Sequence, residues 1–210
     1  MAVLQGFDTA LDVGRHAASL RAQGMDFVIR YYSHDTAKNL GPAEARSLCG
    51  AGLRLGAVWE SAGTHAGYFS RQQGLQDASD ALRQARALGQ PPGSAIYFAV
   101  DYDASRADVD GPIADYFGAL RAALNGAAGY RIGVYGSGLC CGAMVDRGLA
   151  ALSWLAQSRG YCGSQAYAQA MRYDLIQSLG ARISVDGAPL DIDPDASHPE
   201  RDPGLFMLAA

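Results

Sequence analysis

The sequence predicts an α/β protein built on a parallel sheet. Short apolar runs of strand length alternate with longer helical patterns along the chain, and such long connections imply parallel strands. Runs such as 27–32 and 95–101 are apolar throughout, as expected for strands that are buried on both faces. About eight such strands either close into a (β/α) barrel or form an open doubly wound sheet. No GxGxxG follows the first strand and no GxxxxGK[ST] occurs, which disfavours a nucleotide-binding open sheet.

In the first half of the chain, glycine and proline mark the ends of the helices. Gly24, Gly52 and Gly89 each follow a helical pattern, at the position where glycine commonly ends a helix. Pro42 lies near the start of a helix, where proline is tolerated. The expected strands are 3–8, 27–32, 53–60 and 95–101, and the expected helices are 13–23, 42–51 and 70–88.

The second half repeats this rhythm and ends in a tail. The expected helices are 109–124 and 138–148, with Asp108 as the N-cap of the first, and the expected strands are 130–135, 152–156 and 173–177. Segment 183–192 is interpreted as a hairpin or a bent eighth strand around Asp186-Gly187. We therefore expect one domain over residues 1–196 and a C-terminal tail over 197–210. The chain after Pro194 is rich in Pro, Asp and His and is expected to be loop or disordered, although 205–208 can dock.

Composition excludes several classes of protein. The net charge is -4 and no basic stripe occurs, which argues against nucleic acid as the main partner. No apolar run reaches about 18 residues, so no membrane insertion is expected. The start MAVLQGFD lacks the pattern of a signal peptide, which predicts a protein that is cytoplasmic as synthesised or exported by a non-classical, secretion-system or phage route. The four cysteines form no CxxC, so no zinc or other metal site is expected.

Two aspartates end the apolar run 95–101 abruptly. If the strand continues through Asp101-Tyr102-Asp103, both carboxylates lie on one side of it, with their backbones roughly 6–7 Å apart. Carboxylates at about this separation can supply the acid and the base of a glycosidase. The alternative is a loop that caps the next helix or binds a cation.

Polar and aromatic residues stand at the ends of most predicted strands. In a barrel these ends gather around one mouth, which carries the chemistry. Neighbouring carboxyl groups raise each other's pKa, and aromatic faces suit the apolar faces of sugars. Each residue also has a structural alternative, such as a helix cap, a solvated loop acid or core packing. The residues in question are Asp8, Arg30, Tyr31, Tyr32, Trp59, Glu60, Asp101, Asp103, Tyr135, Trp154, Gln157, Gln177, Asp191 and Asp193.

Eight short motifs, in order, resemble a known family. They are GFD, VIRYY, AVWES, IYFAVDYD, IGVYGSG, WLAQ, DLIQ and LDID, and they run from Gly6 to Asp193. This pattern resembles the glycoside-hydrolase-like domain family DUF1906, which is similar to the family 25 glycoside hydrolases, the Chalaropsis-type lysozymes. The resemblance implies a single (β/α)8 TIM-type barrel, regular or irregular, whose mouth accommodates a bacterial peptidoglycan-like glycan.

The resemblance also implies roles for individual residues. The lysozyme family has an aspartate at the end of its first strand and a D-x-E at the end of its fourth, which Asp8 and Asp101-Tyr102-Asp103 match. Asp103 therefore stands in the place of the family's expected general acid, a glutamate, and is one methylene shorter. Glu60 is an alternative acid. Gln177 matches a tryptophan-glutamine pair of the seventh strand, and Asp191 matches a late aspartate.

The leading hypothesis is a lysozyme or muramidase-type glycoside hydrolase that cleaves β-1,4 amino-sugar linkages of peptidoglycan without a cofactor. Its expected catalytic residues are Asp8, Glu60, Asp101 and Asp103. Its expected substrate-binding residues are Tyr31, Trp59, Tyr135, Trp154, Gln177 and Asp191. The first alternative is a catalytically weak or inactive glycan-binding domain on the same barrel. The second is a metal-dependent hydrolase that uses Asp8, Asp101, Asp103 and Asp191.

Overall fold

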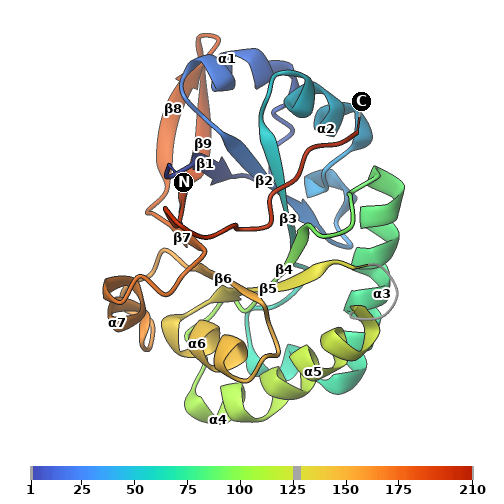
Figure 1. The fold of residues 1–210 in the computed structure, drawn as a ribbon, viewed down its shortest axis with the longest axis vertical. Coiled ribbons are helices and arrows are strands. Elements are labelled where there is room, and N and C mark those ends of the chain that lie inside the picture. Colours follow the sequence, from blue (N-terminus) through green and yellow to red (C-terminus); the bar gives the residue numbers. More distant parts are fainter. Residues whose placement is uncertain (1, 125–128, 210) are drawn as a thin grey trace.

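The protein is a closed β-barrel surrounded by helices, as Figure 1 shows in a computed structural model that describes residues 2–124 and 129–209. Seven consecutive strands, β1 to β7, pair in parallel, and β9 completes the ring by pairing with both β7 and β1. The predicted eight-stranded barrel is confirmed. The strands are β1 (Gln5–Asp8), β2 (Phe27–Tyr32), β3 (Arg54–Trp59), β4 (Ala95–Ala99), β5 (Arg131–Gly136), β6 (Leu152–Leu155), β7 (Leu175–Gln177), β8 (Ala181–Val185) and β9 (Ala188–Ser197).

Helices cover the outside of the barrel between successive parallel strands (Figure 1). The α-helices are α1 (Ala17–Ala22), α2 (Pro42–Gly50), α3 (Arg71–Leu88), α4 (Arg106–Asp110), α5 (Pro112–Leu124), α6 (Gly138–Asp146) and α7 (Ser164–Gln169). Short 3-10 turns precede three of them, namely η1 (Gly14–His16), η2 (Thr36–Lys38) and η3 (Ala66–Tyr68). Within the described ranges, no helix combines the length and apolarity needed to cross a membrane.

The barrel is irregular where it closes. The strand β9 runs antiparallel to both of its neighbours in the ring, so the expectation of a parallel strand there is wrong. Only residues 178–187, which include β8, separate β7 from β9, and a parallel crossover needs a dozen or more residues. The hairpin predicted around Asp186-Gly187 is confirmed, and both turn residues have positive φ angles, of 52° and 79°. This conformation suits Asp and Gly in a two-residue hairpin turn.

The helix predicted over 109–124 is two helices. The helix α4 begins earlier, after Ser105, and α5 begins at Pro112, which has no N–H to continue the hydrogen-bond ladder. Ser105, rather than the expected Asp108, is the N-cap; Asp108 completes a capping box three residues later. The helix α7, over Ser164–Gln169, had no counterpart among the predicted elements.

The C-terminal segment is ordered and closes the end of the barrel opposite the mouth. The Ala95 N–H donates to the Gly204 carbonyl oxygen (2.9 Å), and the Tyr97 hydroxyl donates to that of Pro203 (2.8 Å). Phe206 is buried and forms a β-bridge with Leu55. Residues 198–209 form no helix or strand, so the loop expected there is confirmed, and so is the docking expected for 205–208, at Phe206. The strand β9 also extends through Ser197, beyond the predicted boundary.

Candidate active site

The end of β4 differs from the prediction in a way that separates its two aspartates. The strand ends at Ala99, and the Asp101 N–H donates to the Gly63 carbonyl oxygen (2.8 Å) instead of continuing the ladder. Gly63 can approach this strand end because it has no Cβ, which would collide with the Ala99 carbonyl oxygen. Asp101 is half-buried, whereas Asp103 is exposed and accepts a hydrogen bond from the Cys162 N–H (2.7 Å). The prediction that one strand carries both carboxylates is therefore wrong.

The mouth holds a cavity of about 120 Å³ that brings together seven of the ten predicted site residues. Strand alternation explains the convergence, because every second residue of each strand points into the barrel. The cavity is lined by Asp8, Tyr31, Val58, Glu60, Asp101, Tyr135, Trp154, Gln157, Gln177 and Asp193. A more open groove of about 710 Å³ adjoins it and shares Asp8, Tyr31 and Asp193.

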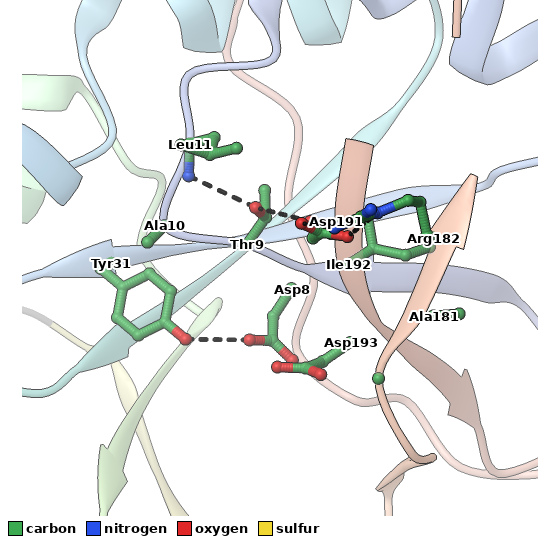
Figure 2. Close-up of a pocket in the computed structure, with 11 residues that line it drawn as sticks. Asp8, Thr9, Ala10, Leu11, Tyr31, Ala181, Arg182, Asp191, Ile192 and Asp193 are labelled. Carbon is green, nitrogen blue, oxygen red and sulfur yellow. Dashed lines mark hydrogen bonds and ion pairs between the residues drawn. The ribbon is translucent and has the colours of Figure 1, made fainter. Parts of the chain in front are cut away.

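Asp8 is the centre of a hydrogen-bond network on the cavity floor. The Tyr31 hydroxyl donates to Asp8 Oδ1 (2.9 Å), a bond visible in Figure 2, and Gln177 Nε2 donates to Asp8 Oδ2 (2.6 Å). The amide orientation of Gln177 is set from its other side, where its Oε1 accepts from the Tyr135 hydroxyl (2.9 Å) and the Gln157 N–H (3.2 Å). The carboxylate of Asp8 is thus held in one orientation by donors from two strands, β2 and β7.

A further buried acid, Asp195, lies below the cavity and was not among the predicted site residues. Trp154 Nε1 donates to Asp195 Oδ1 (2.7 Å), while Asp195 Oδ2 has no donor among the described residues. The Asp195 and Asp8 carboxyls are close enough that each shifts the pKa of the other. The period-two spacing of Asp191, Asp193 and Asp195 could have indicated this inward face of a strand. The interpretation of the tail after Pro194 as loop hid it.

All of these acids have raised pKa values. Burial raises the pKa of Asp8 to about 7, against the hydrogen bonds from Gln177 and Tyr31, which lower it. Burial raises the pKa of Asp195 well above its ordinary range, and the charge of Asp8 adds to this. Burial also raises the pKa values of Glu60, Asp101 and Asp193. The mouth therefore retains protonated carboxyl groups closer to neutral pH than free carboxyls do, as a general acid requires.

Three predicted site residues lie outside the cavity. Asp103 is at the exposed rim, as noted above. Trp59 is buried on the outer face of β3, where its ring meets His34 edge-on (centroids 5.2 Å apart), so it is a packing residue between sheet and helices. Asp191 is exposed in the adjoining groove and forms two hydrogen bonds with Arg182, of 2.6 and 2.9 Å (Figure 2).

No metal site is assigned. Over residues 2–124 and 129–209, the His, Cys, Asp and Glu side chains form no group of three or more that could hold a metal ion. The four cysteines are free thiols.

The closed barrel and its acid-lined mouth define a glycoside hydrolase-like protein. More particularly, the chain belongs to the family of Rv2525c-like glycoside hydrolase-like domains, whose profile matches residues 18–195. The family resemblance expected from the eight motifs is therefore confirmed.

The chain is also similar to one relative and to two solved structures. The uncharacterized protein YbfG of Bacillus subtilis is 32% identical over 94% of the chain, which spans only 29% of the length of YbfG. The Tat-secreted protein Rv2525c of Mycobacterium tuberculosis, solved in complex with L-tartrate, has a TM-score of 0.77 at 21% identity, covering 97% of this chain and 98% of that one. A bacterial lysozyme from Streptomyces coelicolor has a TM-score of 0.53 at 16% identity, covering 91% and 90%. Both structural likenesses concern the fold.

Proposed function

We propose that this protein is a glycosidase of the lysozyme type that cleaves the β-1,4-linked amino-sugar backbone of peptidoglycan. The observation that carries the proposal is the convergence of Asp8, Glu60, Asp101 and Asp193 on one cavity at the barrel mouth. Glycosidic cleavage needs one carboxylic acid to protonate the leaving oxygen and a carboxylate to support the oxocarbenium-like centre or a water. The lysozyme fold of the S. coelicolor protein supports the same class of substrate.

Glu60 is the proposed general acid. It follows the last residue of β3, its side chain lines the cavity, and burial raises its pKa. Asp101 lines the same cavity from the next strand and is proposed to orient the substrate's acetamido group or a water. Asp8, at the floor, is proposed to stabilise developing positive charge, and the Tyr31 and Tyr135 hydroxyls to help position the sugar. Trp154 supplies an aromatic wall.

Asp103 has a different proposed role. Its carboxylate accepts the Cys162 N–H at the exposed rim, so it fastens the segment that follows β6 instead of facing the cavity. This placement agrees with a general acid on the neighbouring strand, at Glu60.

A second candidate function is glycan binding without turnover. The feature that favours it is the aspartate at position 103, where the lysozyme family is expected to carry its acid. On this proposal, the cavity carboxylates accept hydrogen bonds from sugar hydroxyls and do not transfer protons.

The test is an assay of purified peptidoglycan for released reducing ends and for fragment masses. We expect the wild type to release muropeptides, and Glu60→Gln and Asp101→Asn each to reduce the rate by at least a hundredfold, because general acid-base groups are worth about 10²–10⁴. Asp103→Asn is the matched control two residues away and should retain most activity, and circular dichroism should show all three variants folded. Release by Glu60→Gln and Asp101→Asn at the wild-type rate would refute the assignment. Pelleting with cell wall without any release would favour the binding function.

A further inference from the structure

Lys38 is the only lysine of the chain, and it stands beside the acidic mouth. It is the last residue of η2, on the connection that follows β2. Its Nζ lies 4.8 Å from the centroid of the Tyr31 ring, a distance at which an ammonium is attracted by an aromatic face. Tyr31 lines both the cavity and the adjoining groove, so Lys38 lies against a residue that the two share without itself lining either.

The backbone of Lys38 is held by a buried ion pair. Arg30 points to the outside of the barrel, where it pairs with Glu44 (2.8 Å) and both side chains are almost fully buried. The same guanidinium donates to the carbonyl oxygens of Lys38 (3.1 Å) and Thr9 (2.5 Å). One buried group therefore fixes both the turn that carries Lys38 and the loop that follows Asp8.

The ammonium group of Lys38 has no ion-pair partner among the described residues. In the described part of the chain, no carboxylate lies within ion-pair distance of Lys38 Nζ, and no hydrogen bond of this atom is present. Its charge still acts on the mouth, because it lowers the pKa of Glu60 against the larger rise caused by burial. Lys38 is thus close to the cavity without being neutralised by it.

Lys38 differs in charge from the residues that line the cavity. The residues that line the cavity include four carboxyl groups and neither lysine nor arginine. In the adjoining groove, the guanidinium of Arg182 is already bound by both oxygens of Asp191. A negatively charged ligand group entering the mouth would be repelled by the carboxylates, except on the Tyr31 side, where Lys38 offers an unpaired positive charge.

We propose that Lys38 binds a carboxylate of the glycan, so that the ligand is an amino-sugar polymer whose sugars carry carboxylate groups and not a neutral polymer. The inference rests on the proposed glycan substrate and deepens it. Lysine acts here as a point charge.

The experiment compares two forms of one ligand. Peptidoglycan strands stripped of their peptides carry free lactyl carboxylates, and coupling these to methylamine gives the neutral counterpart. Binding of each form is measured by calorimetry at low and high salt, for the wild type and for Lys38→Gln, Lys38→Arg and Arg86→Gln. Arg86→Gln is the charge-matched control, since this exposed arginine lies in the last turn of α3.

We expect the wild type to prefer the charged strands by roughly threefold to tenfold, and this preference to shrink in high salt. Lys38→Gln should lose the preference, whereas Lys38→Arg and Arg86→Gln should keep it. An unchanged preference in Lys38→Gln, or none in the wild type, would overturn the inference. Binding of neither form would overturn the glycan proposal with it. A Lys38-dependent preference without any cleavage would uphold the inference and reject the glycosidase.

Discussion

Asp8 and Asp195 bring two buried carboxyl groups together beneath the barrel mouth, where β1 and β9 pair, and each shifts the pKa of the other. In the register of these strands, Asp8 lies opposite Asp193 and Asp195 lies opposite Gly6. Burial and the charge of Asp8 raise the pKa of Asp195 well above its ordinary range, so we expect Asp195 to keep its proton and to present it to Asp8. Asp8 accepts hydrogen bonds from Tyr31 and Gln177.

This pair predicts how stability depends on pH. A carboxyl whose pKa is raised by folding contributes stability below its unfolded pKa of about 4, and that contribution is lost as the pH rises through the folded pKa. Asp195→Asn removes this ionisation, while its amide still donates to Asp8 and still accepts from Trp154. We therefore expect Asp195→Asn to match the wild type in thermal unfolding at pH 4 and to exceed it at pH 9.

Two further variants serve as controls for the Asp195→Asn prediction. Glu200→Gln, at an exposed acid, should leave the difference between pH 4 and pH 9 unchanged. Asp195→Ala should be destabilised at both pH values, because Trp154 Nε1 loses its buried acceptor at a cost of about 1–3 kcal/mol. If Asp195→Asn melts below the wild type at pH 9, the shared-proton arrangement is wrong.

Gln177 should affect the pH at which activity falls on the acidic side of the pH profile, called here the acid limb. Burial raises the pKa of Asp8 to about 7, and the proposed mechanism uses Asp8 as a carboxylate, so activity should fall as the pH drops below about 7. The bond from Gln177 lowers this pKa, so Gln177→Leu should move the acid limb to higher pH as well as weakening activity. Gln76→Leu removes a comparable glutamine–aspartate bond, to Asp80 on α3, and should not move the limb. Coincident pH profiles for Gln177→Leu and the wild type would exclude this role.

Breaking the buried ion pair of Arg30 and Glu44 should lower the free energy of unfolding more than breaking any other ion pair described here. The side chains are 0% and 1% exposed, so Arg30→Met leaves an uncompensated carboxylate in the interior. We expect a loss of about 3–5 kcal/mol in urea unfolding. Arg131→Met, which breaks the partly exposed pair with Asp202, should cost no more than about 1 kcal/mol. Equal losses in the two variants would contradict this ranking.

The C-terminal segment should contribute to stability through one side chain. Phe206 is 4% exposed and Met207 is 40% exposed, although they are neighbours in the chain. Phe206→Ala should therefore cost about 3–5 kcal/mol, as truncation of a buried aromatic does, and Met207→Ala much less. Denaturant midpoints of the two variants check this, and similar midpoints would mean that the segment does not seal the barrel.

Local pattern was sufficient for most of the fold. The run 27–32 became β2 without change, and the apolar runs ending at Asp8 and Gln177 became strands that deliver those side chains to the mouth. Inward residues at strand ends follow from alternation, which is why Tyr31, Tyr135 and Trp154 were found. Where a strand ended early, at Ala99, the same alternation misplaced Asp103.

The sequence by itself determined most of the order of strands and helices, the family and the acidic character of the mouth, because these depend on hydrophobic period and on residues at strand ends. Only the tertiary structure decided the antiparallel closure by β9, the pairing of Asp195 with Asp8 and the place of Lys38 over Tyr31. These contacts join segments that are distant in the chain or lie in an irregular loop. Packing across the barrel decides which residues meet there, and the local periodicity of the sequence does not indicate it.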